Sequence, residues 1–266
     1  MKGFLEAALW VGIGSRAVKQ SGQWIHQRTL NFLIVTIVLL VVVDAQTAFG
    51  QMQVRKPGTY SQTMRVDDHT TLGYAISIPE KYSPSDPVPL VLALHFGGTP
   101  NGAGQRMLGI LVKPALEGLG AIIVAPDSLG GGWETAANER AVIALLDAVQ
   151  AAYRIDTTKI VVTGFSMGGA GAWHFAGKYP ERFRAAVPVS GRPPNSIETW
   201  RTPVLAIHSR QDEVVPIGPA SARIRELQKA GVRAEFIELT GISHHETYRF
   251  VDGLRRAVPW LKETWQ

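Results

Sequence analysis

The chain has 266 residues, of which 45% are apolar and 18% are charged, and its 27 glycines and 16 prolines are spread along its length. This composition excludes a collagen-like chain, a coiled coil and an intrinsically disordered chain. The sequence contains no cysteine, which excludes disulfides, thiolate metal ligands and a cysteine nucleophile. The formal net charge is +5, but the basic residues form no run or stripe, so we expect no nucleic-acid partner.

The most apolar segment of the chain, Leu30 to Val43, lies near its beginning. Arg28 stands just before this segment, and a short stretch rich in small residues, 45–51, follows it. Fourteen helical residues span ~21 Å, which is less than the ~30 Å hydrocarbon core of a bilayer. A positive flank, a short apolar stretch and a small-residue site are typical of a secretory signal peptide, with cleavage after Ala45 or Gly50.

These features divide the chain into two predicted regions. Residues 1–50 form an N-terminal extension with a signal peptide or a membrane anchor, and residues 51–266 form one folded domain. We therefore expect an exported protein, periplasmic or extracellular. The alternative is a membrane-anchored protein, tethered through Leu30 to Val43, with the folded domain outside the cytoplasm.

Strand and helix patterns alternate along the rest of the chain. Apolar or β-branched runs predict strands at 60–66, 73–78, 88–95, 121–125, 160–163, 185–189, 204–208 and 234–239. Helices are predicted at 139–153, 167–179, 219–230 and 247–265. The central strands are apolar at nearly every position, which is typical of parallel strands covered on both faces. The sequence thus predicts a single α/β domain with a mainly parallel, eight-stranded sheet flanked by helices.

The pentapeptide GFSMG, centred on Ser166, joins the predicted strand 160–163 to the predicted helix 167–179. A strand–turn–helix elbow is the setting in which a G-x-S-x-G sequence holds a nucleophilic serine. Because the turn strains the backbone, the residues two before and two after the serine must lack side chains. Gly164 and Gly168 meet this requirement. Ser166 is therefore the candidate nucleophile.

A serine nucleophile needs a base, and the base needs an orienting acid. In this kind of fold the chain order is serine, acid, histidine. Asp212 follows a predicted buried strand and is the candidate acid, with Glu213 as its rival. After the next strand, His244 is the candidate base, because the G-x-x-H spacing is typical of that role, and its neighbour His245 is the alternative.

Acyl transfer also requires two donors that bind the developing oxyanion. The backbone N–H of Met167, the residue after the nucleophile, is the first candidate. The second should come from the loop after the third strand, where the chain reads LHFGG. We expect the N–H of Gly97 to be this donor, with that of Phe96 as the alternative, because glycine lets the backbone approach a substrate closely.

Several segments together resemble the α/β-hydrolase superfamily: LHFGG, APDS, GGGW, YRID, GFSMGGAGAW, KYPERF, SRQDEVVP and GISHHET. Within it, the chain is similar to exported esterases, to phospholipase/carboxylesterase-like proteins and to polyhydroxybutyrate-depolymerase-like proteins. The resemblance runs from about Gly73 to Leu261. The chain departs from it in having Phe96 where many members have glycine. It also has no long insertion between Pro188 and Pro203, so we expect no large lid and an open, shallow site.

By motif position, the resemblance implies Ser166 as nucleophile, Asp212 as acid, His244 as base, and Gly97 and Met167 as oxyanion donors. It implies an ester substrate, small or lipid-like, cleaved through an acyl-enzyme, without a metal or an organic cofactor. Two other hypotheses remain open at this stage. One is a serine peptidase on the same fold, and the other is a non-catalytic, membrane-tethered binding module.

Overall fold

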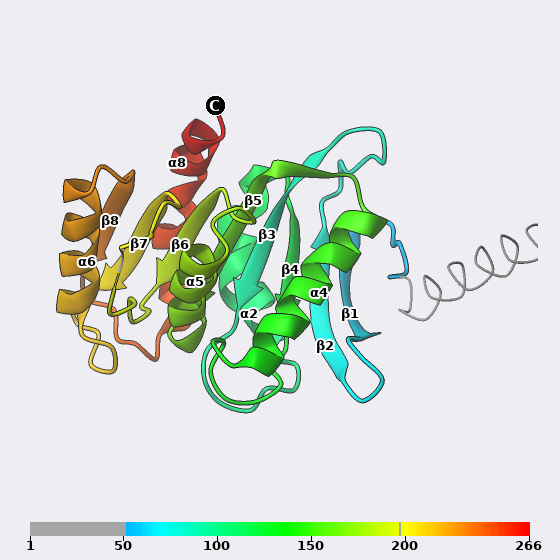
Figure 1. The fold of residues 1–266 in the computed structure, drawn as a ribbon, viewed down its shortest axis with the longest axis horizontal. Helices are drawn as coiled ribbons and strands as arrows, with labels where there is room; N and C mark the ends of the chain where they lie inside the picture. Colours follow the sequence, from blue (N-terminus) through cyan, green and yellow to red (C-terminus); the bar gives the residue numbers. More distant parts are fainter. Residues whose placement is uncertain (1–51, 197) are drawn as a thin grey trace, which may run out of the picture. The chain divides into compact units, whose positions relative to one another are not determined.

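The computed structural model describes residues 52–196 and 198–266, and within them the chain folds around one eight-stranded sheet (Figure 1). The strands are β1 (Gly58–Arg65), β2 (Thr71–Ile78), β3 (Val88–Leu94), β4 (Ile122–Pro126), β5 (Ile155–Phe165), β6 (Ala185–Val189), β7 (Val204–Ser209) and β8 (Ala234–Leu239). Their order in the sheet is β1-β2-β4-β3-β5-β6-β7-β8. β2 pairs antiparallel with β1 and β4, and the remaining pairs are parallel.

The helices are α2 (Ala103–Met107), α3 (Lys113–Leu116), α4 (Ala136–Ala152), α5 (Met167–Lys178), α6 (Ile217–Lys229), α7 (Val251–Arg255) and α8 (Ala257–Thr264). A π-helical segment, η1 (Leu108–Val112), joins α2 to α3, and short 3₁₀ segments, η2 (Glu117–Leu119) and η3 (Thr247–Phe250), follow α3 and precede α7.

Alternating side chains of the central strands enter two separate cores, one on each face of the sheet. In β3, Leu90, Leu92 and Leu94 point to one face, whereas Val91 and Ala93 point to the other. Helices α4, α5 and α6 cover the first face, and α2, α3, α7 and α8 cover the second (Figure 1). Because both faces are covered, these strands tolerate apolar residues at consecutive positions. The predicted fold class is confirmed.

The structure corrects two expectations about helices. The predicted helix 247–265 is broken into η3, α7 and α8. Pro259 causes the second break, because its ring clashes with the carbonyl of the residue four positions earlier, Arg255, where α7 ends. In addition, residues 103–119, for which the sequence analysis predicted no element, form the chain of short helices from α2 to η2.

The predictions for the N-terminal region, including the signal peptide or anchor at Leu30 to Val43 and the boundary at residue 50, lie outside the described residues. Among residues 52–196 and 198–266, none of the helices is both long and apolar enough to span a bilayer.

Two glycines in the α2–η1 segment differ sharply in what surrounds them, and this difference predicts opposite effects on stability. A Cβ atom at Gly104 would lie 2.1 Å from the carbonyl oxygen of Ala125, whereas a Cβ at Gly109 would meet nothing within 4 Å. We expect Gly104→Ala to lower the free energy of unfolding by about 3 kcal/mol or more, because backbone in β4 would have to move. Gly109→Ala should raise it by about 0.5–1 kcal/mol by restricting the unfolded chain. Urea unfolding measures both, and equal effects of the two changes would contradict this packing.

Candidate active site

Ser166 lies at the junction of β5 and α5 and has a strained backbone, with φ 56° and ψ −115°. A positive φ is costly for a residue with a side chain, so surrounding contacts must hold it in place. The Ser166 N–H donates a 3.0 Å hydrogen bond to the carbonyl of Val189 at the end of β6. The Ser166 carbonyl accepts from the N–H of Ala170 in the first turn of α5 at 2.9 Å. The turn is thus fixed from both sides.

The glycines on either side of Ser166 are required by close backbone contacts. A Cβ at Gly164 would lie 2.2 Å from the carbonyl oxygen of Gly168, and a Cβ at Gly168 would lie 1.9 Å from that of Leu94. Neither contact is sterically possible, and both involve backbone that cannot rotate away. The turn therefore requires glycine at both positions, as predicted, and it places the serine directly beside the end of β3.

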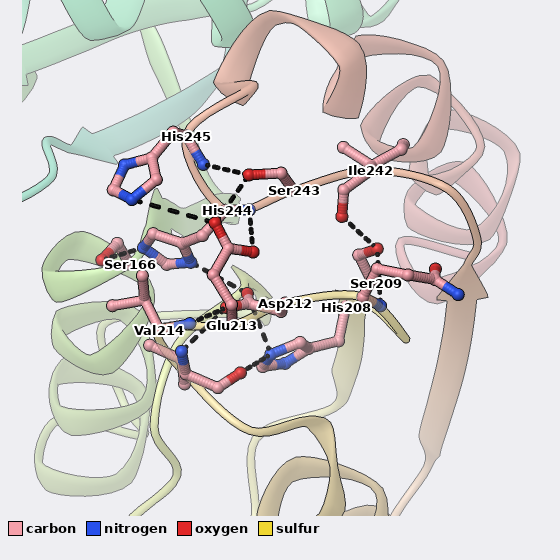
Figure 2. A network of polar contacts seen from close by, with 12 residues as sticks. Ser166, His208, Ser209, Asp212, Glu213, Val214, Ile242, Ser243, His244 and His245 are labelled. Carbon is pink, nitrogen blue, oxygen red and sulfur yellow. Dashed lines mark hydrogen bonds and ion pairs between the residues drawn. The ribbon is translucent and has the colours of Figure 1, made fainter.

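The structure brings Ser166, His244 and Asp212 into one hydrogen-bonded chain (Figure 2). The Nε2 atom of His244 lies 2.8 Å from the Oγ of Ser166, and its Nδ1 atom lies 2.9 Å from the Oδ2 of Asp212. Since an ionised carboxylate only accepts, Nδ1 carries the proton and Nε2 is free to accept the serine proton. The His244 ring is buried and packs against Phe165, with ring centroids 5.0 Å apart.

The Asp212 carboxylate is buried and fully engaged. Its Oδ1 atom accepts hydrogen bonds from the backbone N–H groups of Val214 (3.1 Å) and Val215 (2.8 Å), while Oδ2 faces His244. Burial alone would raise the pKa of Asp212, but the hydrogen bonds from His244 and from the Val215 N–H outweigh it and hold the pKa below its usual value. Asp212 is therefore ionised at neutral pH and can stabilise an imidazolium at His244.

His208, at the end of β7, adds a contact that the sequence did not reveal. Its Nε2–H donates to the carbonyl of Val215 at 2.8 Å and lies 3.3 Å from Oδ2 of Asp212 (Figure 2). Burial lowers the pKa of His208, which keeps the ring neutral. The only available signal in the sequence is the position of His208 four residues before the acid, and many buried histidines share such a position.

Glu213 and His245, the rival candidates, point elsewhere. Glu213 accepts hydrogen bonds from the hydroxyl of Ser243 (2.6 Å) and the N–H of His244 (3.1 Å), so it joins the two loops rather than orienting the ring. The hydrogen bond from Ser243 is the main cause that lowers the pKa of Glu213 to about 2. The His245 side chain is 78% exposed and lies 3.8 Å from Glu213.

The loop after β3 lies against the first turn of α5, because Gly168 packs on the carbonyls of Leu94 and His95. Gly97 is exposed in this loop, and a Cβ there would contact nothing within 4 Å, so the space beside it is open. Met167 is the first residue of α5, where helix N–H groups lack partners within the helix. The two predicted oxyanion donors therefore belong to adjoining segments at one edge of the sheet.

His95 fixes the shape of this loop. Its Nε2 atom accepts a 2.9 Å hydrogen bond from the N–H of Ser128, and Nδ1 therefore carries the proton and donates to the carbonyl of Phe96 at 2.6 Å. The His95 carbonyl accepts from the indole N–H of Trp133 at 3.0 Å. Burial lowers the pKa of His95, so the ring is neutral and acts as a rigid connector.

Chemically, this arrangement offers an activated hydroxyl, a base and an acid. It can take up a proton at one imidazole nitrogen while a bond forms at the serine oxygen. Among residues 52–196 and 198–266, histidine and acidic side chains form no cluster of three or more suited to a metal ion.

Comparison with known families and proteins gives consistent matches. Residues 132–258 match the family "Phospholipase/Carboxylesterase". A probable feruloyl esterase C from Aspergillus terreus is 33% identical over 154 residues, which cover 54% of this chain and 56% of that protein. Feruloyl esterase D from Neurospora crassa is 26% identical over 210 residues, which cover 73% of this chain and 71% of that protein. The chain thus spans little more than half the length of the Aspergillus relative.

Among solved structures, a thermostable esterase superposes with a TM-score of 0.67 at 25% sequence identity, covering 77% of this chain and 62% of that one. A ferulic acid esterase superposes with a TM-score of 0.61 at 16% identity, and at that level the likeness concerns the fold alone.

The buried neutral histidines predict a loss of stability in mild acid. Because the pKa of His208 is lowered in the folded state, the unfolded chain binds more protons below the ordinary histidine value of about 6.5. The stability that comes from keeping His208 neutral should therefore be fully present above this pH. The free energy of unfolding should fall as the pH drops below it. We expect His208→Gln to flatten this dependence in urea titrations between about pH 7.5 and pH 5.5. An equally steep dependence in His208→Gln would contradict the assignment.

Proposed function

Because the chain is an α/β hydrolase whose residues 132–258 belong to the phospholipase/carboxylesterase family, we propose that it is a serine hydrolase of carboxylic esters. The observation that carries this proposal is the hydrogen-bonded chain from Ser166 through His244 to Asp212, on a turn strained at the serine. The match to curated esterases supports the same reaction class.

The reaction follows from the directions of the hydrogen bonds along Ser166, His244 and Asp212. His244 Nε2 takes the proton of Ser166 as Oγ attacks the ester carbonyl carbon, and the carbonyl oxygen becomes an oxyanion facing the N–H groups of Met167 and Gly97. The resulting imidazolium, stabilised by Asp212, gives its proton to the alcohol oxygen as the C–O bond breaks. An acyl group then remains on Ser166. A water molecule attacks it with His244 again as the base, which releases the carboxylic acid and restores the serine.

We further propose hydroxycinnamoyl esters, such as feruloyl esters, as the substrate class. The support comes from the relatives, of which several are named feruloyl esterases. The chain contains the serine elbow, the acid loop and the base loop in the region that aligns with the phospholipase/carboxylesterase family. An aromatic acyl group offers a flat apolar surface to an open site, and the partly exposed Phe96 beside Gly97 presents such a surface.

We propose export as the cellular fate, with membrane anchoring through Leu30 to Val43 as the alternative outcome of the test. The support is the positive flank, the apolar stretch and the small residues that follow it. N-terminal sequencing of the protein recovered outside the cytoplasm decides between cleavage near residue 50 and an intact anchor.

Removal of the nucleophile should abolish ester hydrolysis. We expect Ser166→Ala to lower kcat for p-nitrophenyl acetate by at least about a thousandfold, because no other group forms the acyl-enzyme. Its circular dichroism spectrum should be unchanged. Ser85→Ala, which alters an exposed serine in the loop between β2 and β3, is the matched control and should retain full activity. Hydrolysis by Ser166→Ala at the control rate would reject the mechanism.

A substrate panel tests the acyl preference and the reaction class together. Methyl ferulate should be hydrolysed with a higher kcat/KM than methyl acetate, since the aromatic acyl group adds apolar contact. Feruloyl amide and peptide anilides should be inert, because an amine is a poorer leaving group than an alcohol. Comparable cleavage of anilides would instead favour the peptidase hypothesis, and equal rates for the two methyl esters would reject the hydroxycinnamoyl assignment.

A further inference from the structure

A cavity of about 350 Å³ lies between the segment that follows β6 and the beginning of α6. Four prolines contribute to its walls: Pro193, Pro194, Pro216 and Pro219. Proline fixes its own backbone angle and lacks an N–H donor, so these parts of the walls are rigid and offer no backbone donor. The volume falls within the range of small-molecule sites.

Each wall of this cavity belongs to a segment that is hydrogen-bonded to a residue of the triad. On one side, Val189 accepts the hydrogen bond from the Ser166 N–H, and Arg192, three residues later, lines the cavity. On the other side, Val215 donates its N–H to the carboxylate of Asp212 and also lines the cavity. The cavity is therefore linked to the triad through Val215, which lines it and is hydrogen-bonded to Asp212.

The position of the cavity relative to the strands indicates which half of an ester, acyl or alcohol, it can hold. The oxyanion loop with Gly97 follows β3, on one side of β5, whereas β6 and β7 lie on the other side. A carbonyl oxygen directed at Gly97 leaves the alcohol oxygen to receive its proton from His244, which follows β8 and is hydrogen-bonded to Asp212 in the loop after β7. The alcohol half of the ester accordingly extends toward the side on which the cavity lies.

The charged side chains that line the cavity favour a negatively charged ligand. Two arginines, Arg192 and Arg223, line it against one acid, Glu226. Arg223 is already engaged, because it pairs with Glu226 and donates to the carbonyl of Asn195 at 3.1 Å. Arg192 is exposed and has no carboxylate within ion-pair distance among residues 52–196 and 198–266. A guanidinium in this situation binds a carboxylate through paired hydrogen bonds.

We propose that this proline-walled cavity is a subsite for the alcohol half of the substrate, and that Arg192 selects esters whose alcohol carries a carboxylate group. The proposal rests on the proposed esterase function and adds a preference within it. The class of ligand includes phenolic acids, hydroxy acids and uronic acids esterified through a hydroxyl group.

Two esters that share an acetyl group test the proposal: para-acetoxybenzoate, whose leaving group carries a carboxylate, and para-acetoxybenzamide, whose leaving group is neutral. The readout is the ratio of their kcat/KM values. We expect Arg192→Gln to lower this ratio about fivefold relative to the wild type, as suits one partly exposed ion pair. Arg192→Lys should lower the ratio less than Arg192→Gln does, because the positive charge is kept although the paired hydrogen bonds of the guanidinium are lost. Raised salt should move the wild-type ratio toward that of Arg192→Gln.

Arg201→Gln is the matched control, because Arg201 is also exposed but lines a different cavity, near the opposite end of β7. Its ratio should equal that of the wild type. A ratio in Arg192→Gln within about twofold of the wild type would overturn the subsite, whatever the absolute rates. Failure of the wild type to hydrolyse either ester would instead count against the proposed function, so the two failures are distinguishable.

Discussion

The turn at Ser166 depends on backbone approaching backbone without an intervening side chain. Gly164 and Gly168 sit so close to neighbouring carbonyls that a single added carbon at either position would overlap them. This closeness lets α5 begin against the end of β3 and lets β6 accept the hydrogen bond of the serine N–H. The nucleophile and the oxyanion loop are consequently positioned by one steric constraint.

The polar groups around this turn form a network in which charge is placed selectively. Asp212 is held ionised by donors on both oxygens, while two buried histidines, His95 and His208, are held neutral by desolvation. Each neutral ring donates one hydrogen bond to a backbone carbonyl and so fixes a loop. This division leaves His244 as the imidazole placed to exchange a proton with the serine. Glu213, in turn, ties the acid loop to the base loop from the solvent side.

Much of this arrangement could be predicted from the sequence, for reasons that are local. The apolar strands, the glycines around Ser166 and the chain order of serine, acid and histidine each constrain few alternatives. Spacing favoured His244 over His245, but only the conformation of the turn shows that the His244 ring reaches Ser166 while the His245 ring is exposed. The contacts of His95 and His208 depend on loop conformations that bring them to Ser128 and Val215, and spacing along the chain does not give those conformations.

The helices at 103–119 escaped prediction for a different reason. Their buried residues do recur at helical spacing, from Met107 to Leu119. Three glycines and Pro114 interrupt the segment, however, and such residues usually indicate a loop. Packing against the sheet stabilises these short helices despite their weak intrinsic propensity. The opposite happened in the C-terminal segment. Its apolar periodicity predicted one continuous helix, although Pro259 indicated a break.

The most direct test of the account is covalent labelling by a fluorophosphonate, followed by peptide mapping. Residue 166 is the only serine in the tryptic peptide of residues 160–178, so an adduct on this peptide can be localised by fragmentation. The account predicts one adduct per chain, on Ser166, formed rapidly in the wild type and at a strongly reduced rate in His244→Ala. The absence of an adduct on the folded wild-type protein, or equally fast labelling of the His244→Ala variant, would contradict it.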